Sequence, residues 1–188
     1  RSWSQIVALV RKAVEAAEPG EWIVGEGWHQ DKWDEMPKEL VGGFPTHREL
    51  SAAAPDNPVL LTHASYHFCV TNAYGMRLAG ISMSTPNPAG GEIVRDATGA
   101  ATGVFVESGV KLIAEAAETS EQGRTPGQIE ADRHRCIRLA VEYCLSKGVT
   151  GFHDAGSDLD TIDFLKRLAE AGDIDLRLWG MINESNVR

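Results

Sequence analysis

His67 and Asn72 carry side chains that can bind a small polar substrate. An imidazole donates a hydrogen bond or carries a proton, and a carboxamide binds a carbonyl or carboxylate group. The apolar run 59–61 predicts a buried strand, and from Cys69 the apolar positions change to helical spacing. We therefore expect both side chains to face one pocket at a strand-to-helix turn. The alternative is that both satisfy backbone groups of that turn, and His63 is more typical of local packing.

His153 and Asp154 are the candidate catalytic residues. The strand predicted over 149–153 delivers them to its carboxyl end, where β/α barrels place their active sites. In the alternative interpretation, Asp154 caps the next structural element and His153 fills a polar gap.

Glu107 and Trp28 are further candidates for substrate binding. Glu107 follows an apolar strand, so its carboxylate can hold a ligand or orient a water molecule. Its alternative role is to favour a helix N-terminus electrostatically. Trp28 can line an apolar pocket, although an aromatic residue beside glycine turns also suits a core.

Hydrophobic periodicity predicts the elements that position these side chains. Apolar residues at helical spacing indicate helices, and short runs rich in β-branched or alternating apolar residues indicate strands. The order strand, helix, strand after residue 148 favours a parallel β-α-β unit. The predicted helices cover 3–17, 125–147 and 161–171, and the predicted strands cover 22–24, 59–61, 92–95, 102–106, 149–153 and 174–182.

Composition excludes several classes of protein. The 188 residues are 43% hydrophobic, enough for a full core, and a formal net charge of −9 opposes binding to nucleic acid. The three cysteines have no zinc-ribbon or disulfide-framework spacing, which favours a cytoplasmic protein. No apolar run approaches the ~20 residues of a membrane span, so we expect no membrane association.

Several motifs together resemble one branch of the metal-dependent amidohydrolases, which includes the N-substituted formamide deformylase type. One is H-x-x-x-x-N at His67 and Asn72, followed by AGIS. The others occur in the order typical of that family and are WIVGEGW (22–28), THRELSAAAPDNP (46–58), PAGGEIVRDATGAATGVFVE (88–107) and GVTGFHDA (148–155).

This resemblance implies a divalent metal, expected to be zinc, in a (β/α)₈ TIM-like barrel. The family binds its metal through a His-x-His on the first barrel strand and further ligands on later strands. This sequence contains no His-x-His, so we expect the ligands to lie outside this chain and assign no metal ligand within it. By the same resemblance, the chain looks like an internal fragment.

The expected fold is α/β, with a small insertion domain over 1–130 and the second and third strands of a barrel, with their helices, over 131–188. The expected function is hydrolysis of an amide-like C–N bond of a small-molecule substrate by a metal-activated water. The fragment alone is expected to be inactive and to self-associate, as a homo-oligomer, through uncovered strands. Two alternatives stay open, a non-catalytic binding or interaction module and a metal-free acid/base hydrolase.

Overall fold

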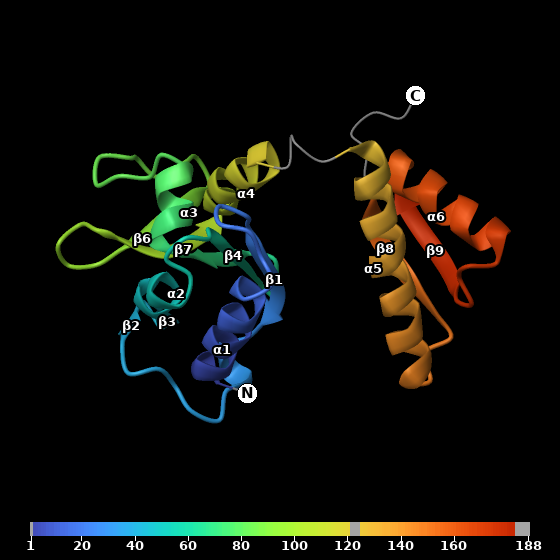
Figure 1. Ribbon diagram of the computed structural model, residues 1–188, viewed down its shortest axis with the longest axis horizontal. Helices are drawn as coiled ribbons and strands as arrows, with labels where there is room; N and C mark the ends of the chain where they lie inside the picture. Colours follow the sequence, from blue (N-terminus) through green and yellow to red (C-terminus); the bar gives the residue numbers. More distant parts are fainter. Residues whose placement is uncertain (1, 121–124, 183–188) are drawn as a thin grey trace. The chain divides into compact units, whose positions relative to one another are not determined.

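The computed structural model describes residues 2–120 and 125–182. The chain divides into two compact units, Arg1–Gly123 and Arg124–Arg188. Figure 1 shows their helices and strands. Helix α5 (Pro126–Ser146) belongs entirely to the second unit. The domain boundary expected from the sequence, after residue 130, lies inside this helix.

The first unit is built on a five-stranded mixed sheet. Strands β1 and β4 are parallel, and every other neighbouring pair is antiparallel. The strands in spatial order are β1 (Ile23–Trp28), β4 (Val59–His63), β5 (Phe68–Thr71), β7 (Ala101–Glu107) and β6 (Gly91–Arg95). The long connection from β1 to β4 contains a 3₁₀ turn η1 (Gln30–Lys32), the short strands β2 (Leu40–Val41) and β3 (Phe44–Pro45), and helix α2 (Arg48–Ala53).

Helices cover both faces of this sheet and make a three-layer α/β/α sandwich (Figure 1). Helix α1 (Trp3–Val14) and helix α2 pack on one face, and α3 (Ala73–Leu78) and α4 (Ser108–Ser120) pack on the other. Strand side chains alternate between the two cores. In β4, Val59 and Leu61 join the core under α1, and Leu60 joins the core under α4.

The prediction of helical spacing from Cys69 is wrong, because residues 68–71 form strand β5. Cys69 and Val70 are both fully buried and enter opposite cores. A central strand that is covered on both faces has a continuous apolar run, which periodicity does not distinguish from a buried helix. Helix α3 begins only at Ala73.

The second unit contains a parallel β-α-β unit, as predicted. After α5 come β8 (Gly151–Ser157), α6 (Leu159–Ala171) and β9 (Arg177–Ile182), and β8 pairs in parallel with β9. Thr125 and Gln128 form a capping box at the start of α5. The α/β fold class is therefore confirmed, whereas membership of these two strands in a barrel stays a prediction.

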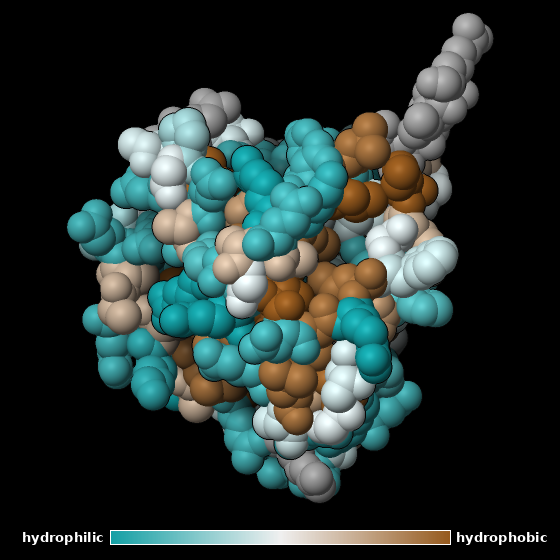
Figure 2. Space-filling view, turned by 90° about the vertical axis from the view of Figure 1, so that its right-hand side faces the viewer, coloured by the Kyte–Doolittle hydropathy of each residue, from teal (hydrophilic) through white to brown (hydrophobic). Residues whose placement is uncertain are grey.

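The second unit buries one face of its two-stranded sheet. Leu178 packs with a core of Val141, Ile174 and Leu176, so its neighbour Trp179 points to the opposite face, where 67% of it is exposed. Figure 2 shows hydrophobic surface among hydrophilic residues on one face of the molecule. No helix within the described residues is long and apolar enough to cross a membrane.

Candidate functional site

One end of the five-stranded sheet gathers polar side chains. His63 ends β4, His67 directly precedes β5, and Glu107 ends β7. Since β5 is antiparallel to both β4 and β7, the end of β4, the start of β5 and the end of β7 lie at the same end of the sheet. The sheet thus brings together residues from distant parts of the sequence.

His67 and Glu107 form a surface pair at this end of the sheet. The imidazole Nδ1 of His67 lies 2.9 Å from Oε1 of Glu107, and both side chains are more than half exposed. The backbone N–H of Glu107 also donates to the carbonyl of His67 at 2.8 Å. An accessible imidazole beside a carboxylate can bind a polar substrate group or move a proton.

Two residues with positive φ lie at this pair of side chains. Tyr66 (φ 61°) and Glu107 (φ 50°) are the non-glycine residues in the left-handed region within 2–120 and 125–182. Such positions cost about 1–3 kcal/mol each, and they cluster at functional sites. The strained backbone here directly flanks His67 on one side and carries its carboxylate partner on the other.

Tyr66 makes a second contact with a carboxylate. Its hydroxyl donates to Oε2 of Glu26, a residue of strand β1, at 3.2 Å. The negative charge of Glu26, and then this hydrogen bond, raise the pKa of the Tyr66 phenol above its usual value. Tyr66 therefore stays a hydrogen-bond donor at neutral pH.

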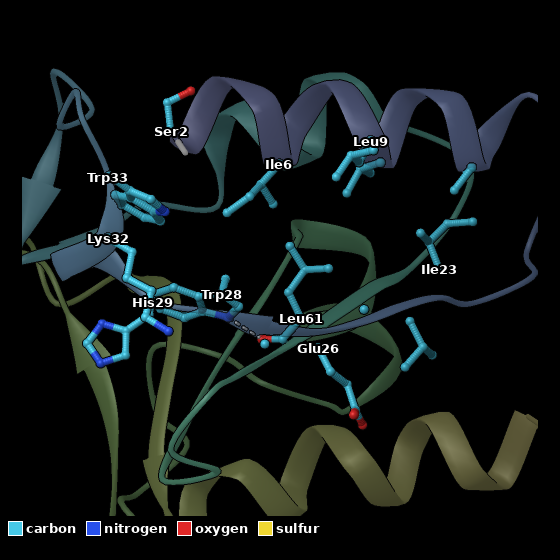
Figure 3. Close-up of a pocket in the computed structure, with 15 residues that line it drawn as sticks. Ser2, Ile6, Leu9, Ile23, Glu26, Trp28, His29, Lys32, Trp33 and Leu61 are labelled. Carbon is cyan, nitrogen blue, oxygen red and sulfur yellow. Dashed lines mark hydrogen bonds between the residues drawn. The ribbon is translucent and has the colours of Figure 1, made fainter. Parts of the chain in front are cut away.

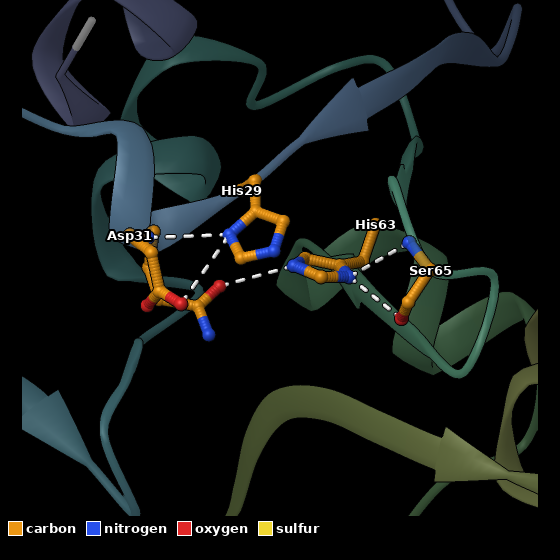
Figure 4. Close-up of polar contacts among 5 residues, drawn as sticks. His29, Asp31, His63 and Ser65 are labelled. Carbon is orange, nitrogen blue, oxygen red and sulfur yellow. Dashed lines mark hydrogen bonds and ion pairs between the residues drawn. The ribbon is translucent and has the colours of Figure 1, made fainter.

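His63 ends the neighbouring strand β4 and is only 3% exposed. Figure 4 shows its ring between Ser65 and the segment 29–31. Nδ1 accepts the backbone N–H of Ser65 at 3.0 Å and lies 2.8 Å from the Ser65 hydroxyl, and Nε2 lies 3.1 Å from Oε1 of Gln30. The ring of His29 packs against that of His63 in a tilted arrangement, with 4.6 Å between the ring centroids, and Nδ1 of His29 accepts the backbone N–H of Asp31 at 3.3 Å.

A cavity of about 510 Å³ lies between α1 and β1 (Figure 3). This volume suits a small organic ligand. Trp28 forms part of its wall and is held in place because its indole N–H donates to the carbonyl of Leu61 at 3.0 Å. Glu26 and His29 also line the cavity, so it reaches the polar end of the sheet.

Asn72 occupies the opposite end of β5 from His67 and is fully buried. Its Oδ1 accepts the N–H groups of Val59 (3.1 Å) and Gly75 (2.9 Å), and its Nδ2 donates to the carbonyls of Ala54 (2.9 Å) and Asn57 (2.8 Å). The structure does not bring His67 and Asn72 into one pocket, because the residues between them are extended rather than helical. The contacts of Asn72 correspond to the structural alternative.

His153 and Asp154 lie within β8 rather than at its carboxyl end, because that strand continues to Ser157. His153 is exposed, with its ring 6.1 Å from that of Trp179, and Asp154 accepts a hydrogen bond from the Ser157 hydroxyl. Asp158, not Asp154, caps the following helix. The catalytic role of His153 and Asp154 stays a prediction.

The described residues contain no group of three or more His, Cys, Asp or Glu side chains that fits a metal ion. Cys69 does not add a ligand, since burial raises the pKa of its thiol to about 12. The metal that the family resemblance implies does not fit these residues.

Two parts of this site were missed in the sequence. The contacts of His63 with Gln30 and of Tyr66 with Glu26 both depend on the parallel pairing of β1 with β4. Only the turn between strands 59–63 and 68–71, once recognised as a hairpin, would have pointed to His67 and its neighbours.

The fold and site define an α/β protein with polar side chains gathered at one end of a mixed sheet. Residues 1–187 match the amidohydrolase family. The chain belongs to this family, which confirms the family predicted from the sequence.

Two curated relatives are similar to this chain. N-substituted formamide deformylase of Arthrobacter pascens is 29% identical over 177 residues, covering 93% of this chain and 30% of that protein. Protein LONG AFTER FAR-RED 3 of Arabidopsis thaliana is 30% identical over 151 residues, covering 79% and 23%. The chain thus spans less than a third of the length of either relative.

A solved structure of an uncharacterized metal-dependent hydrolase from Pyrococcus horikoshii OT3 is 22% identical. It matches with a TM-score of 0.49 over 94% of this chain and 31% of that one.

Proposed function

We propose that the whole protein hydrolyses an amide-like C–N bond of a small molecule with a metal-activated water, and that this chain supplies part of the substrate pocket. Membership of the amidohydrolase family carries the proposal. It is further supported by a relative whose name denotes a deformylase of N-substituted formamides.

In this proposal a divalent metal, expected to be zinc, is held by residues outside the described parts of this chain. The described residues contain no group of three or more His, Cys, Asp or Glu side chains that could hold it. We assign no step at the metal to this chain. Its contribution is binding and orientation of the substrate.

In this proposal His67 and Glu107 contact the polar part of the substrate, and the cavity beside Trp28 takes an apolar part. The support for His67 and Glu107 is that both are exposed and held in one geometry by a side-chain and a backbone contact. Trp28 supports the second assignment because its buried ring forms a rigid wall of the cavity.

A second candidate is metal-free acid/base hydrolysis. The observation that favours it is the 2.9 Å contact between His67 Nδ1 and Glu107 Oε1, since a carboxylate that orients an imidazole is a common general-base arrangement. The two candidate functions predict different kinetic effects of substitutions at His67 and Glu107.

The test is to assay the whole protein on N-formyl and N-acyl amines, with and without a chelator, as wild type, His67→Ala and Glu107→Gln. The matched control is His134→Ala, since His134 forms another exposed ion pair with Asp173, at 3.3 Å, in the second unit. A binding role predicts a KM raised by about tenfold with a smaller change in kcat, and loss of activity with chelator.

Acid/base catalysis predicts instead that kcat falls by at least about 100-fold and that the chelator has no effect. Absence of turnover on every amide would reject the hydrolase proposal. Unchanged kcat/KM in both variants would reject the role of the pair alone.

A further inference from the structure

We propose that His63 is a positioning residue: its neutral ring, protonated at Nε2, holds the turn 64–67 in the conformation that sets His67 against Glu107. Only the consequence for substrate binding rests on the proposed function. The structural role is a property of this chain.

The surroundings of His63 fix the ring in place. It contacts the ring of Trp28 at 4.7 Å and that of Phe68 at 5.5 Å, both edge to face, and it is almost fully buried. A side chain packed in this way has one orientation, so its two nitrogens have fixed partners.

Those partners determine the tautomer. The backbone N–H of Ser65 can only donate, so Nδ1 of His63 must be the acceptor. Nε2 therefore carries the proton and donates to Oε1 of Gln30. A proton on Nδ1 would face the Ser65 N–H and remove this hydrogen bond.

Ser65 transmits this constraint to His67. The Ser65 hydroxyl lies 2.8 Å from Nδ1 of His63 and accepts the backbone N–H of His67 at 3.3 Å. The carbonyl of His63 also accepts the N–H of Tyr66 at 2.9 Å, the residue with φ 61°. The main chain thus enters β5 with His67 beside Glu107.

The groups around the ring oppose its protonation. Burial is the largest cause that lowers the pKa of His63, and His29 and His67 lower it further, whereas Asp31 from η1 raises it. These are the titratable groups that act on it from the segment after β1 and from the turn. The neutral ring therefore persists at neutral pH, and acidification should release the turn.

The test uses NMR on this chain, with ¹⁵N shifts of the His63 ring and exchange rates of the amide protons. We expect an unprotonated Nδ1 and a protonated Nε2 in the wild type. Protection of the Ser65 and His67 amides should be lost on acidification, in the same titration that protonates His63.

The variant His63→Phe keeps a ring and removes both nitrogens, so exchange at Ser65 should rise by about tenfold or more while exchange at Val70 is unchanged. His63→Asn, whose Oδ1 can replace Nδ1 as acceptor, should restore protection. His29→Phe is the matched control, because the ring of His29 packs against that of His63 at 4.6 Å and its Nδ1 accepts from the Asp31 N–H rather than from the turn.

If His63→Phe does not fold, Ser65→Ala at an exposed position tests the link from Ser65 to His67, with loss of protection at His67 expected, while His63→Asn and the ring shifts of the wild type test the link from His63 to Ser65. A protonated Nδ1 in the wild type, or unchanged protection at Ser65 and His67 in the variants, would overturn the proposal. In the whole protein, His63→Phe should raise KM by about tenfold and His63→Asn should lower it again. If the NMR changes occur without a change in KM, the substrate-binding role proposed for His67 and Glu107 fails and the positioning role of His63 stands.

Discussion

His67 faces Glu107 across the β5–β7 pair, and the two residues are joined twice, by Nδ1 to Oε1 at 2.9 Å and by the Glu107 N–H to the His67 carbonyl at 2.8 Å. The exposed side-chain contact alone would add little stability. The backbone contact is what keeps the two side chains in register, so the geometry exists without a bound ligand.

The positive φ of Glu107 predicts that substitutions there affect stability and substrate binding differently. Because φ is 50°, Glu107→Gly should be more stable than Glu107→Ala by about 1 kcal/mol. Neither variant has the carboxylate, so both should bind substrate equally weakly. Urea unfolding measures the difference, and equal stability of the two variants would show that this position is not strained.

Asn72 should be a stability residue. Asn72→Ala leaves the buried N–H of Val59 and two carbonyls without partners and removes the α3 cap, at a cost of about 2–4 kcal/mol. Its control is Asn87→Ala, which removes a hydrogen bond from the Ile93 N–H and should cost no more than about 1.5 kcal/mol. A fully stable Asn72→Ala protein with impaired substrate binding would support the binding role predicted from the sequence.

The free energy of unfolding should decrease on acidification from about pH 6.5. Burial is the main cause that lowers the pKa values of both His47 and His63, so the unfolded chain binds protons first as the pH falls. The loss continues until the pH passes the lowered pKa values of the folded state. Urea unfolding at several pH values measures it, and the double variant His47→Asn/His63→Asn should have a shallower slope. An identical slope in the double variant would contradict this assignment.

The 188-residue chain alone should neither hydrolyse N-formyl or N-acyl amines nor bind zinc stoichiometrically. Catalysis by a metal hydroxide needs several converging ligands, and none of the described clusters provides them. Elemental analysis and an assay beside the whole protein check both statements. Stoichiometric zinc, or turnover at a comparable rate, would mean that the metal site lies within this chain.

The sequence predicted elements well where the pattern is local. Helix α5 and the strand-to-helix junction at Glu107 follow from the pattern of neighbouring residues. The parallel β8–α6–β9 unit follows from the order of its elements. These features need no knowledge of which strands are neighbours.

The arrangement of the candidate site was not predictable in the same way. Residues 68–71 are buried on both faces of the sheet, so their apolar pattern did not identify them as a strand. This strand places His67 and Asn72 at its opposite ends. The pairing of His67 with Glu107 depends on the strand order β5–β7, which no local pattern contains. Asp154 was placed at a strand end because small residues after it conceal three more strand positions.

The cavity beside β1 has two walls with different freedom to vary. Trp28 and Leu61 belong to the hydrophobic core, so a substitution there should cost stability as well as change the cavity. Leu9 on α1 lines the same cavity but is 67% exposed. Larger or smaller side chains at Leu9 can therefore alter the size of ligand that fits while the sheet stays intact.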